Sequence, residues 1–593
     1  MQQISTSSRE SLPVILAAAA VQGWALFGLH HAIKAHTWPA TNLAWLFALY
    51  AVVVLIPLTT QLLADQVRKP ASWTILGLMT LAFFYFGWHH GGSVASFWDQ
   101  HFAESGECFP LAIVLLVLWL ILMPFVQARL QVGRWTAEYR QLFDYAWRNA
   151  ITLAEAVAFT GLFWLLLYLW QSLFHMLQID FFRDLFEEPL FVYPVTSLVF
   201  GCALHLIGSV DRLVSSVLDQ VLNVFKWLGT VSGVLLALFT LALLSRLPGL
   251  VMTGQKAIGA SWLLWLVAVM VLFLNAAFRD GTVGKPYPKW IAVSFRAVFP
   301  LTVIVSLTAI YALYVRAAEY GLSVERVWGF IVAGAVLIYS VGYSFAAINR
   351  GAWFGGISQV NVVVAIVLIV TISLSLTPIL SPYRLAANSQ YAMVLKGRFK
   401  PTDKPSYYSS PFHYLRFDSG AYGRHRLDQL AQLQNHRDAD RIRTLAAASI
   451  RLTSPWQSAS PPTETASEAL AKMVIYPKGR TLDTDLSQRI TAELNDPRRQ
   501  YLWTLALDAR LAGLFVDLSP DSSGSEQFVL LTGSSGVVYQ KSASGWREVG
   551  RASAPDPAAS QEDILSKLAQ GDVSIKDPAW KELWIGAHRI RVQ

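Results

Sequence analysis

The sequence predicts a polytopic α-helical membrane bundle followed by a C-terminal extracytoplasmic α+β domain. Three observations support this prediction. The mean hydropathy is +0.41 and only 15% of the 593 residues are charged, whereas soluble domains have about 25% charged residues. Apolar stretches of membrane-crossing length recur up to residue 380. After Pro378 and Pro382 the composition changes, and charged residues become frequent.

Eleven apolar stretches are long enough to cross a bilayer core, which requires about 20 helical residues. Their predicted ranges are 12–33, 41–63, 73–91, 110–128, 150–174, 189–210, 224–245, 259–278, 291–315, 327–347 and 359–380. Aromatic and basic residues at 136–148 predict an interfacial helix ahead of the fifth span. Residues 1–380 therefore form the predicted transmembrane helical domain.

The basic residues of the loops predict the orientation, because cytoplasmic loops are enriched in Lys and Arg. With the N-terminus in the cytoplasm, fourteen basic residues lie on the inside and six on the outside. The inside residues are Arg9, Arg68, Lys69, Arg129, Arg134, Arg140, Arg148, Arg212, Lys226, Arg279, Lys285, Lys289, Arg296 and Arg350. An odd number of spans then places the C-terminal part outside. In a bacterial inner membrane this compartment is the periplasm.

The C-terminal part is expected to have two segments. Residues 381–460 form a periplasmic linker and helical segment, and residues 461–593 form a periplasmic α+β segment. Within the latter, helices are expected at 484–494 and 497–511. Four short strands joined by Ser/Gly-rich turns predict a β-meander. Their sequences are GLFVDLS, EQFVLLT, GVVYQKS and GWREVGR.

The formal net charge of +8 forms no continuous basic run, so nucleic acid is not an expected partner. The lipid bilayer is the expected environment, and the orienting loops account for much of the positive charge.

One carboxylate inside a predicted span is chemically unusual. Glu155 lies in the fifth span, about six residues from its cytoplasmic end, and His205 lies at a similar depth in the sixth. Arg296 enters the ninth span at a comparable depth. Because an unpaired charge in hydrocarbon is costly, a buried pair of Glu155 with His205 or Arg296 is one hypothesis, serving as a proton or ion relay. The alternative is that Glu155 reaches the interface or makes a structural contact.

An acidic elbow follows the fifth span. It consists of Asp180, Asp184, Glu187 and Glu188 in the loop at 176–188. Acidic side chains at the outer face would suit an enzyme that acts on a lipid-linked substrate. Outside loops are poor in Lys and Arg for topological reasons, however, so these residues need not be catalytic to be acidic.

No motif predicts catalysis, a cofactor or a metal site. Neither GxSxG, HExxH, a P-loop nor GxGxxG occurs on a suitable scaffold. The pairs His30–His31 and His89–His90 lie at helix ends, where they are more typical of interfacial caps than of metal ligands. No catalytic, cofactor-binding or metal-binding residue is therefore assigned.

Several stretches resemble a known family. They are FDYAWRNAITL, LQIDFFRDLFEEPLFVYPVTSLVFG, YGLSVERVWGF, YRLAANSQ and LRFDSGAYGR. Over roughly residues 130–430, and more loosely to the end, the chain resembles the domain-of-unknown-function 4153 family. That family comprises bacterial polytopic membrane proteins with a C-terminal extracytoplasmic portion. The resemblance implies a fold and a compartment, and it brings no established activity.

Three functional hypotheses follow. The first is a non-enzymatic envelope protein whose periplasmic domain senses or docks a protein, glycan or lipid partner. The second is a transporter or lipid-handling carrier that uses the intramembrane Glu155. The third is a membrane enzyme acting on a lipid-linked substrate.

Overall fold

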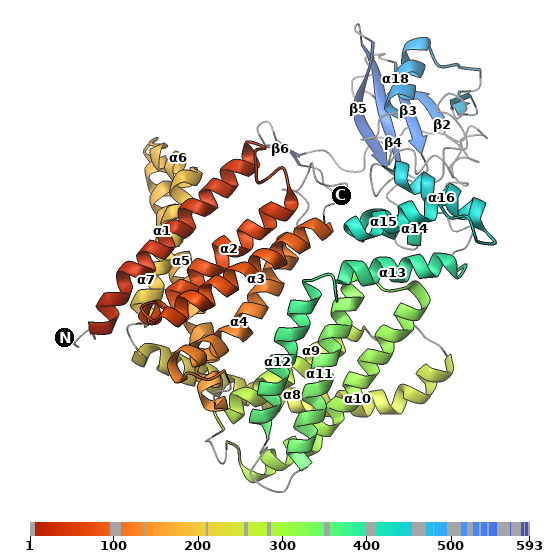
Figure 1. The fold of residues 1–593 in the computed structure, drawn as a ribbon. Helices are drawn as coiled ribbons and strands as arrows, with labels where there is room; N and C mark the ends of the chain where they lie inside the picture. The colour runs from red at the N-terminus through yellow and green to blue at the C-terminus, as the bar shows by residue number, and fades with distance from the viewer. Residues whose placement is uncertain are drawn as a thin grey trace. The chain divides into compact units, whose positions relative to one another are not determined.

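The computed structural model of the chain divides into two compact units (Figure 1). The first unit comprises residues 1–399 and 414–442, and the second comprises residues 400–413 and 443–593. The described residues are 6–94, 108–135, 138–208, 211–253, 259–281, 286–348, 356–398, 410–452, 470–471, 473–477, 479–494, 512–518, 526–532, 535–542, 545–553, 570, 583–585 and 588–590.

The first unit contains the membrane helices. In chain order they are α1 (Thr6–Lys34), α2 (Leu43–Leu62), α3 (Pro70–Val94), α4 (Cys108–Val132), α5 (Tyr139–Met176), α7 (Pro189–Gly208), α8 (Asp211–Thr253), α9 (Ala260–Phe278), α10 (Lys289–Tyr320), α11 (Val324–Ile348) and α12 (Ile357–Ser375). In the described part of the chain, eleven helices are long and apolar enough to cross a membrane. They fall in the same order as the eleven predicted spans, so the prediction of a polytopic helical membrane protein is confirmed.

Short helices complete the two units. The 3-10 helix η1 (Ala64–Gln66) follows α2, and α6 (Phe181–Glu187) lies between α5 and α7. Beyond the last span come α13 (Pro382–Leu395), α14 (Pro411–Phe417), α15 (Gly420–Ala431) and α16 (Ala439–Arg451). Residues 382–398 and 414–442 belong to the compact unit of the membrane helices. The boundary between the units therefore differs from the change in composition at residue 381.

The lead-in to the fifth span is part of that span. Where the sequence predicts a separate interfacial helix at 136–148, α5 is one continuous helix of 38 residues that begins at Tyr139. At 1.5 Å per residue it is about 57 Å long, which exceeds the roughly 30 Å of a hydrocarbon core. A continuous helix satisfies its interior backbone groups without outside partners, so the helix can extend past the apolar region without a break.

Two hydrophobic clusters form the interior of the first unit. One is built from α1 to α4 with parts of α7 and α12, around the fully buried Trp119 and Phe83. The other is built from α8 to α12, around Phe299 and Tyr343. Helix α12 contributes to both, since Ile357 packs in the second cluster and Ile372 in the first.

Hydrogen bonds between helix ends agree with spans that cross the membrane in alternating directions. At one end of the bundle, Lys69 donates to the Leu130 carbonyl (2.7 Å) and Tyr343 donates to Asn275 Oδ1 (2.8 Å). At the other end, the Tyr193 hydroxyl contacts His30 Nδ1 (3.1 Å). Each of these bonds joins ends that alternating spans would place on the same side of a membrane.

The second unit contains a five-stranded sheet in the order β1-β2-β3-β4-β5. The strands are β1 (Val474–Tyr476), β2 (Ala512–Val516), β3 (Gln527–Thr532), β4 (Ser535–Ser542) and β5 (Gly545–Ser553). Strand β1 is parallel to β2, and β2 to β5 form an antiparallel meander. A separate pair consists of β6 (Leu583–Ile585) and β7 (His588–Ile590).

The four strands and the first helix predicted for the C-terminal segment coincide with observed elements. Strands β2 to β5 occupy the predicted meander, and α18 (Thr484–Leu494) matches the helix predicted at 484–494. The core of this unit includes Leu486, Ile490 and Phe528. The helix predicted at 497–511 lies outside the described residues.

Glycine allows close packing between α2 and α3. A Cβ atom at Gly91 would lie 2.4 Å from the Leu43 carbonyl oxygen, and one at Gly87 would lie 2.5 Å from the Phe47 oxygen. The two glycines are one helical turn apart and therefore face the same neighbour. Membrane helices use small residues in this way to bring their backbones together.

The substitution Gly91→Ala is expected to destabilise the protein by about 1–3 kcal/mol, because the added methyl group forces α2 and α3 apart. The measurement is thermal unfolding of the purified full-length protein in detergent. The matched control is Gly92→Ala, since a Cβ at Gly92 meets no atom within 4 Å. Equal melting temperatures for the two variants would contradict this packing.

Candidate functional site

The structure places the three predicted intramembrane residues on three helices. Glu155 lies on α5, His205 on α7 and Arg296 on α10, and all three are half-buried. Helix α5 packs against α7, whereas α10 packs mainly against α8, α9 and α11. Among the described residues, no hydrogen bond or ion pair joins the three side chains. The relay hypothesis stays a prediction.

The acidic elbow is paired locally with basic side chains. Asp180 accepts a hydrogen bond from His175 Nδ1 (2.7 Å), and Glu187 lies 3.4 Å from Arg183 Nε. Asp184 and Glu188 are exposed, as are the paired residues. Exposed pairs of this kind contribute about 0–1 kcal/mol. Their proposed catalytic role stays a prediction.

The chain that follows the last span is bonded to the turn between α10 and α11. Gln390 on α13 is only 4% exposed, and its Nε2 donates to the carbonyls of Tyr320 and Leu322 (3.0 Å each). The neighbouring Ser389 hydroxyl accepts from the Leu322 N–H (2.9 Å). These bonds satisfy backbone groups at the end of α10, which lack partners within the helix. Two side chains of α13, Ser389 and Gln390, therefore provide hydrogen-bond partners for the end of α10 and the turn that follows it.

A tyrosine beyond α13 supports the start of α11. The Tyr414 hydroxyl accepts from the Val324 N–H (2.8 Å), one of the first free N–H groups of that helix. Its own carbonyl accepts from the Ser419 hydroxyl (2.9 Å). Burial raises the pKa of Tyr414 well above its ordinary value. The phenol, which is neutral at physiological pH in any case, resists ionisation at alkaline pH as well.

Helix α15 is joined to the end of α3 in a comparable way. Gly420 begins α15 with φ +57°, and a Cβ there would lie only 1.9 Å from the Ser93 carbonyl oxygen. Two residues later, the Tyr422 hydroxyl contacts His89 Nε2 (3.1 Å). Burial raises the pKa of Tyr422. Only glycine fits this position, because it combines a left-handed backbone with a close approach.

We call this set of contacts the junction. It consists of Ser389, Gln390, Tyr414, Gly420 and Tyr422, together with the ends of α3, α10 and α11 that they touch. Helices α13 and α15 also pack against each other, and Arg426 Nε donates to Asn388 Oδ1 (2.9 Å) between them. The described contacts of the junction join helix ends, mostly through bonds from side chains to backbone groups.

Three of the stretches that carry the family resemblance lie at the junction. YGLSVERVWGF covers the turn between α10 and α11 and the first residues of α11. YRLAANSQ supplies Ser389 and Gln390, and LRFDSGAYGR supplies Gly420 and Tyr422. Sequence reasoning singled out these stretches without finding that they meet. One of the paired histidines, His89, has a structural contact, since it meets Tyr422. The adjoining Gly91 packs on α2.

A network of neutral polar side chains joins four helices at the opposite end of the bundle. Asn361 on α12 donates to Tyr139 on α5 (2.9 Å) and to Asn275 on α9 (2.7 Å), and Tyr343 on α11 also donates to Asn275. The groups involved carry no charge, so burying them costs little once they are bonded to one another. The network fixes the relative positions of these helix ends.

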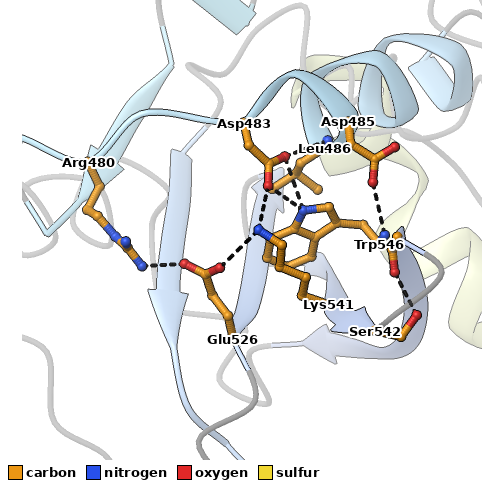
Figure 2. Close-up of polar contacts among 9 residues, drawn as sticks. Arg480, Asp483, Asp485, Leu486, Glu526, Lys541, Ser542 and Trp546 are labelled. Carbon is orange, nitrogen blue, oxygen red and sulfur yellow. Dashed lines mark hydrogen bonds and ion pairs between the residues drawn. The ribbon is translucent and has the colours of Figure 1, made fainter.

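In the second unit, Asp483 is the centre of a polar cluster (Figure 2). Its carboxylate accepts from the Leu486 N–H (2.8 Å), from Trp546 Nε1 (2.9 Å) and from Lys541 Nζ (3.0 Å). The first bond caps α18, whose N-terminal N–H groups need acceptors. The other two attach the helix to the hairpin of β4 and β5.

Charges extend the cluster around Asp483. Lys541 also lies 3.5 Å from Glu526, which pairs with Arg480 as well (Figure 2). Partial burial opposes ionisation of Asp483, but the bonds from Trp546, Leu486 and Lys541 outweigh it and lower its pKa. The arrangement stabilises the fold of this unit and leaves its charges partly exposed.

Searches of family models, curated proteins and solved structures found no match to the chain. The resemblance to the domain-of-unknown-function 4153 family therefore stays a prediction.

The substitution Gln390→Leu is expected to destabilise the protein by about 1–3 kcal/mol, because the carbonyls of Tyr320 and Leu322 lose the donor that the buried Gln390 provides. Thermal unfolding in detergent measures the loss. Hydrogen–deuterium exchange should be faster at residues 320–324 in the variant. Gln432→Leu is the control, since Gln432 is exposed beyond α15. An unchanged exchange rate at residues 320–324 would show that Gln390 does not hold this turn.

The substitution Asp483→Asn is expected to destabilise the second unit by about 1–2 kcal/mol, since the amide loses the charge that its three donors stabilise. Because the pKa of Asp483 is lowered in the folded state, its stabilising contribution is present above the ordinary pKa of a carboxyl group. The contribution is lost as pH falls through the lowered value.

Hydrogen–deuterium exchange of β4 and β5 in the full-length protein at pH 7 tests this prediction. Exchange should be about five- to thirty-fold faster in the Asp483→Asn variant. The control is Arg547→Gln, because Arg547 is an exposed residue of β5. If both variants exchange like the wild-type protein, Asp483 is not the residue that joins α18 to the hairpin.

Proposed function

We propose that the chain is a bacterial inner-membrane protein whose N-terminus lies in the cytoplasm and whose residues 381–593 lie in the periplasm. There, an α+β domain senses or docks an envelope partner, and the protein acts without catalysing a reaction. The observation that most supports this proposal is the junction. It ties the chain that follows the last span to the ends of three spans, so that this segment and the membrane helices form one unit.

The distribution of basic residues supports the proposed orientation. Fourteen Lys and Arg residues against six favour a cytoplasmic N-terminus. Eleven membrane-crossing helices then bring the chain to the opposite side after α12. The junction lies at that end of the bundle.

The second unit supports the docking role because it has a hydrophobic core of its own. Leu486, Ile490, Phe528 and Tyr539 are almost completely buried within it. A unit with its own core presents a defined surface, which a partner needs for specific recognition. The partner would be a protein, a glycan or a lipid of the envelope.

Photo-crosslinking in living cells tests the proposal. A photoreactive amino acid at Arg547 or Val549, both exposed on β5, is expected to crosslink to one discrete envelope component. The same amino acid at Arg134, an exposed residue at the opposite end of the membrane helices, is the control and should not capture that component. Mass spectrometry of the crosslinked band identifies the partner.

Alkaline phosphatase fused after Leu395 checks the compartment in the same cells. The enzyme should be active, because it requires export from the cytoplasm. An inactive fusion would contradict the orientation. An active fusion without any crosslink from the β5 positions would contradict the docking role alone.

A further inference from the structure

Basic side chains lie at both ends of α13 and have no acidic neighbour in their own segment. Arg384 is in the first turn of the helix, and Lys396 and Arg398 follow its last turn. Residues 382–398 contain no Asp or Glu. All three basic residues are exposed. The helix therefore presents two positively charged ends about 20 Å apart.

We expect these charges to lie at the depth of lipid head groups, because α13 directly follows the last span. The last span ends at Ser375 and α13 begins at Pro382, only a few residues later. Helix α13 lies across the ends of α10, α11 and α12 and packs against α11 (Figure 1). Its buried residues include Ala386, Ala387 and Val394. A helix that runs along the ends of spans lies at the interface between hydrocarbon and water.

The two arginines are oriented by neutral partners. Arg384 donates to the Pro378 carbonyl (2.8 Å), and Arg398 donates to the Ala318 carbonyl near the end of α10 (2.9 Å). In the described part of the chain, neither guanidinium group forms an ion pair with a carboxylate. A guanidinium has five N–H donors, so each arginine is held in place with donors and a full charge still available.

The phosphate groups of phospholipids are the anions found in the head-group layer. Arg binds phosphate through paired N–H donors, and these charge-assisted bonds are stronger than neutral ones. Anionic lipid surfaces attract each nearby basic residue. In the proposed orientation the charges lie on the side where loops are poor in Lys and Arg, so topology gives no separate reason for them.

We propose that the two basic ends of α13 bind the phosphate groups of anionic phospholipids in the adjoining leaflet. Arg384 contacts lipid at one end, and Lys396 and Arg398 contact lipid at the other. Bound lipid then holds α13, and through Gln390 the turn between α10 and α11, against the membrane surface. This inference concerns lipid and does not depend on which envelope partner the second unit recognises.

Lipid titration of the purified full-length protein in detergent tests this inference, with the melting temperature as the readout. Phosphatidylglycerol is expected to raise the melting temperature at lower concentration than phosphatidylcholine. In the variant Arg384→Gln/Lys396→Gln/Arg398→Gln, the half-maximal concentration of phosphatidylglycerol should rise about five-fold for each charge removed. Glutamine keeps a hydrogen-bond donor at each position, so the contacts to carbonyls can persist.

Two variants serve as controls. Arg384→Lys/Arg398→Lys keeps the charges and should retain most of the preference for phosphatidylglycerol. Arg547→Gln removes an exposed charge from β5 and should respond like the wild-type protein. Native mass spectrometry should also show fewer retained phosphatidylglycerol molecules on the triple variant.

Three results would overturn the inference. One is an equal response of the wild-type protein to phosphatidylglycerol and phosphatidylcholine, which needs no variant to fold. Another is an unchanged response of the triple variant. The third is full stabilisation by inorganic phosphate alone, which would indicate a site for free phosphate instead of lipid.

Discussion

The structure of the first unit depends on satisfying backbone groups where the chain turns at the membrane surface. The end of α10 and the start of α11 have carbonyl and N–H groups without partners in their own helices. Gln390, Ser389 and Tyr414 provide those partners from later in the chain. A displacement of α13 would break these bonds. Each buried polar group left without a partner costs about 1–3 kcal/mol. This constraint makes the segment after the spans part of the membrane unit.

The same constraint accounts for the residue types at the junction. Gln390 has two amide hydrogens and can therefore serve two carbonyls at once. Gly420 permits the left-handed turn that brings α15 against the Ser93 carbonyl. Tyr414 and Tyr422 reach backbone and histidine partners through neutral hydroxyl groups, and burial raises the pKa of both further above its ordinary value. Neutral groups suit a site next to hydrocarbon because their burial has a low cost once they are bonded.

The spans could be predicted because each is a continuous apolar stretch long enough to cross a bilayer. The sequence also located β2 to β5 and α18, whose boundaries follow local turn and capping residues such as Asp483. The junction could not be predicted, since the partners of Gln390 are about 70 residues away in the chain. Likewise, the charges of α13 form no run in the sequence. They become a feature only because the helix lies across the ends of the spans.

The junction connects two halves of the membrane unit that have separate hydrophobic clusters. Helix α3 belongs to the cluster around Trp119, and α11 belongs to the cluster around Phe299. Helix α15 is tied to α3 through Gly420 and Tyr422, while α13 is tied to the turn before α11 through Gln390. Because α13 and α15 also pack on each other, a displacement of either helix acts on both clusters. A ligand that favours one arrangement of this pair would thereby shift the relative position of the two halves, by as much as its affinity differs between arrangements.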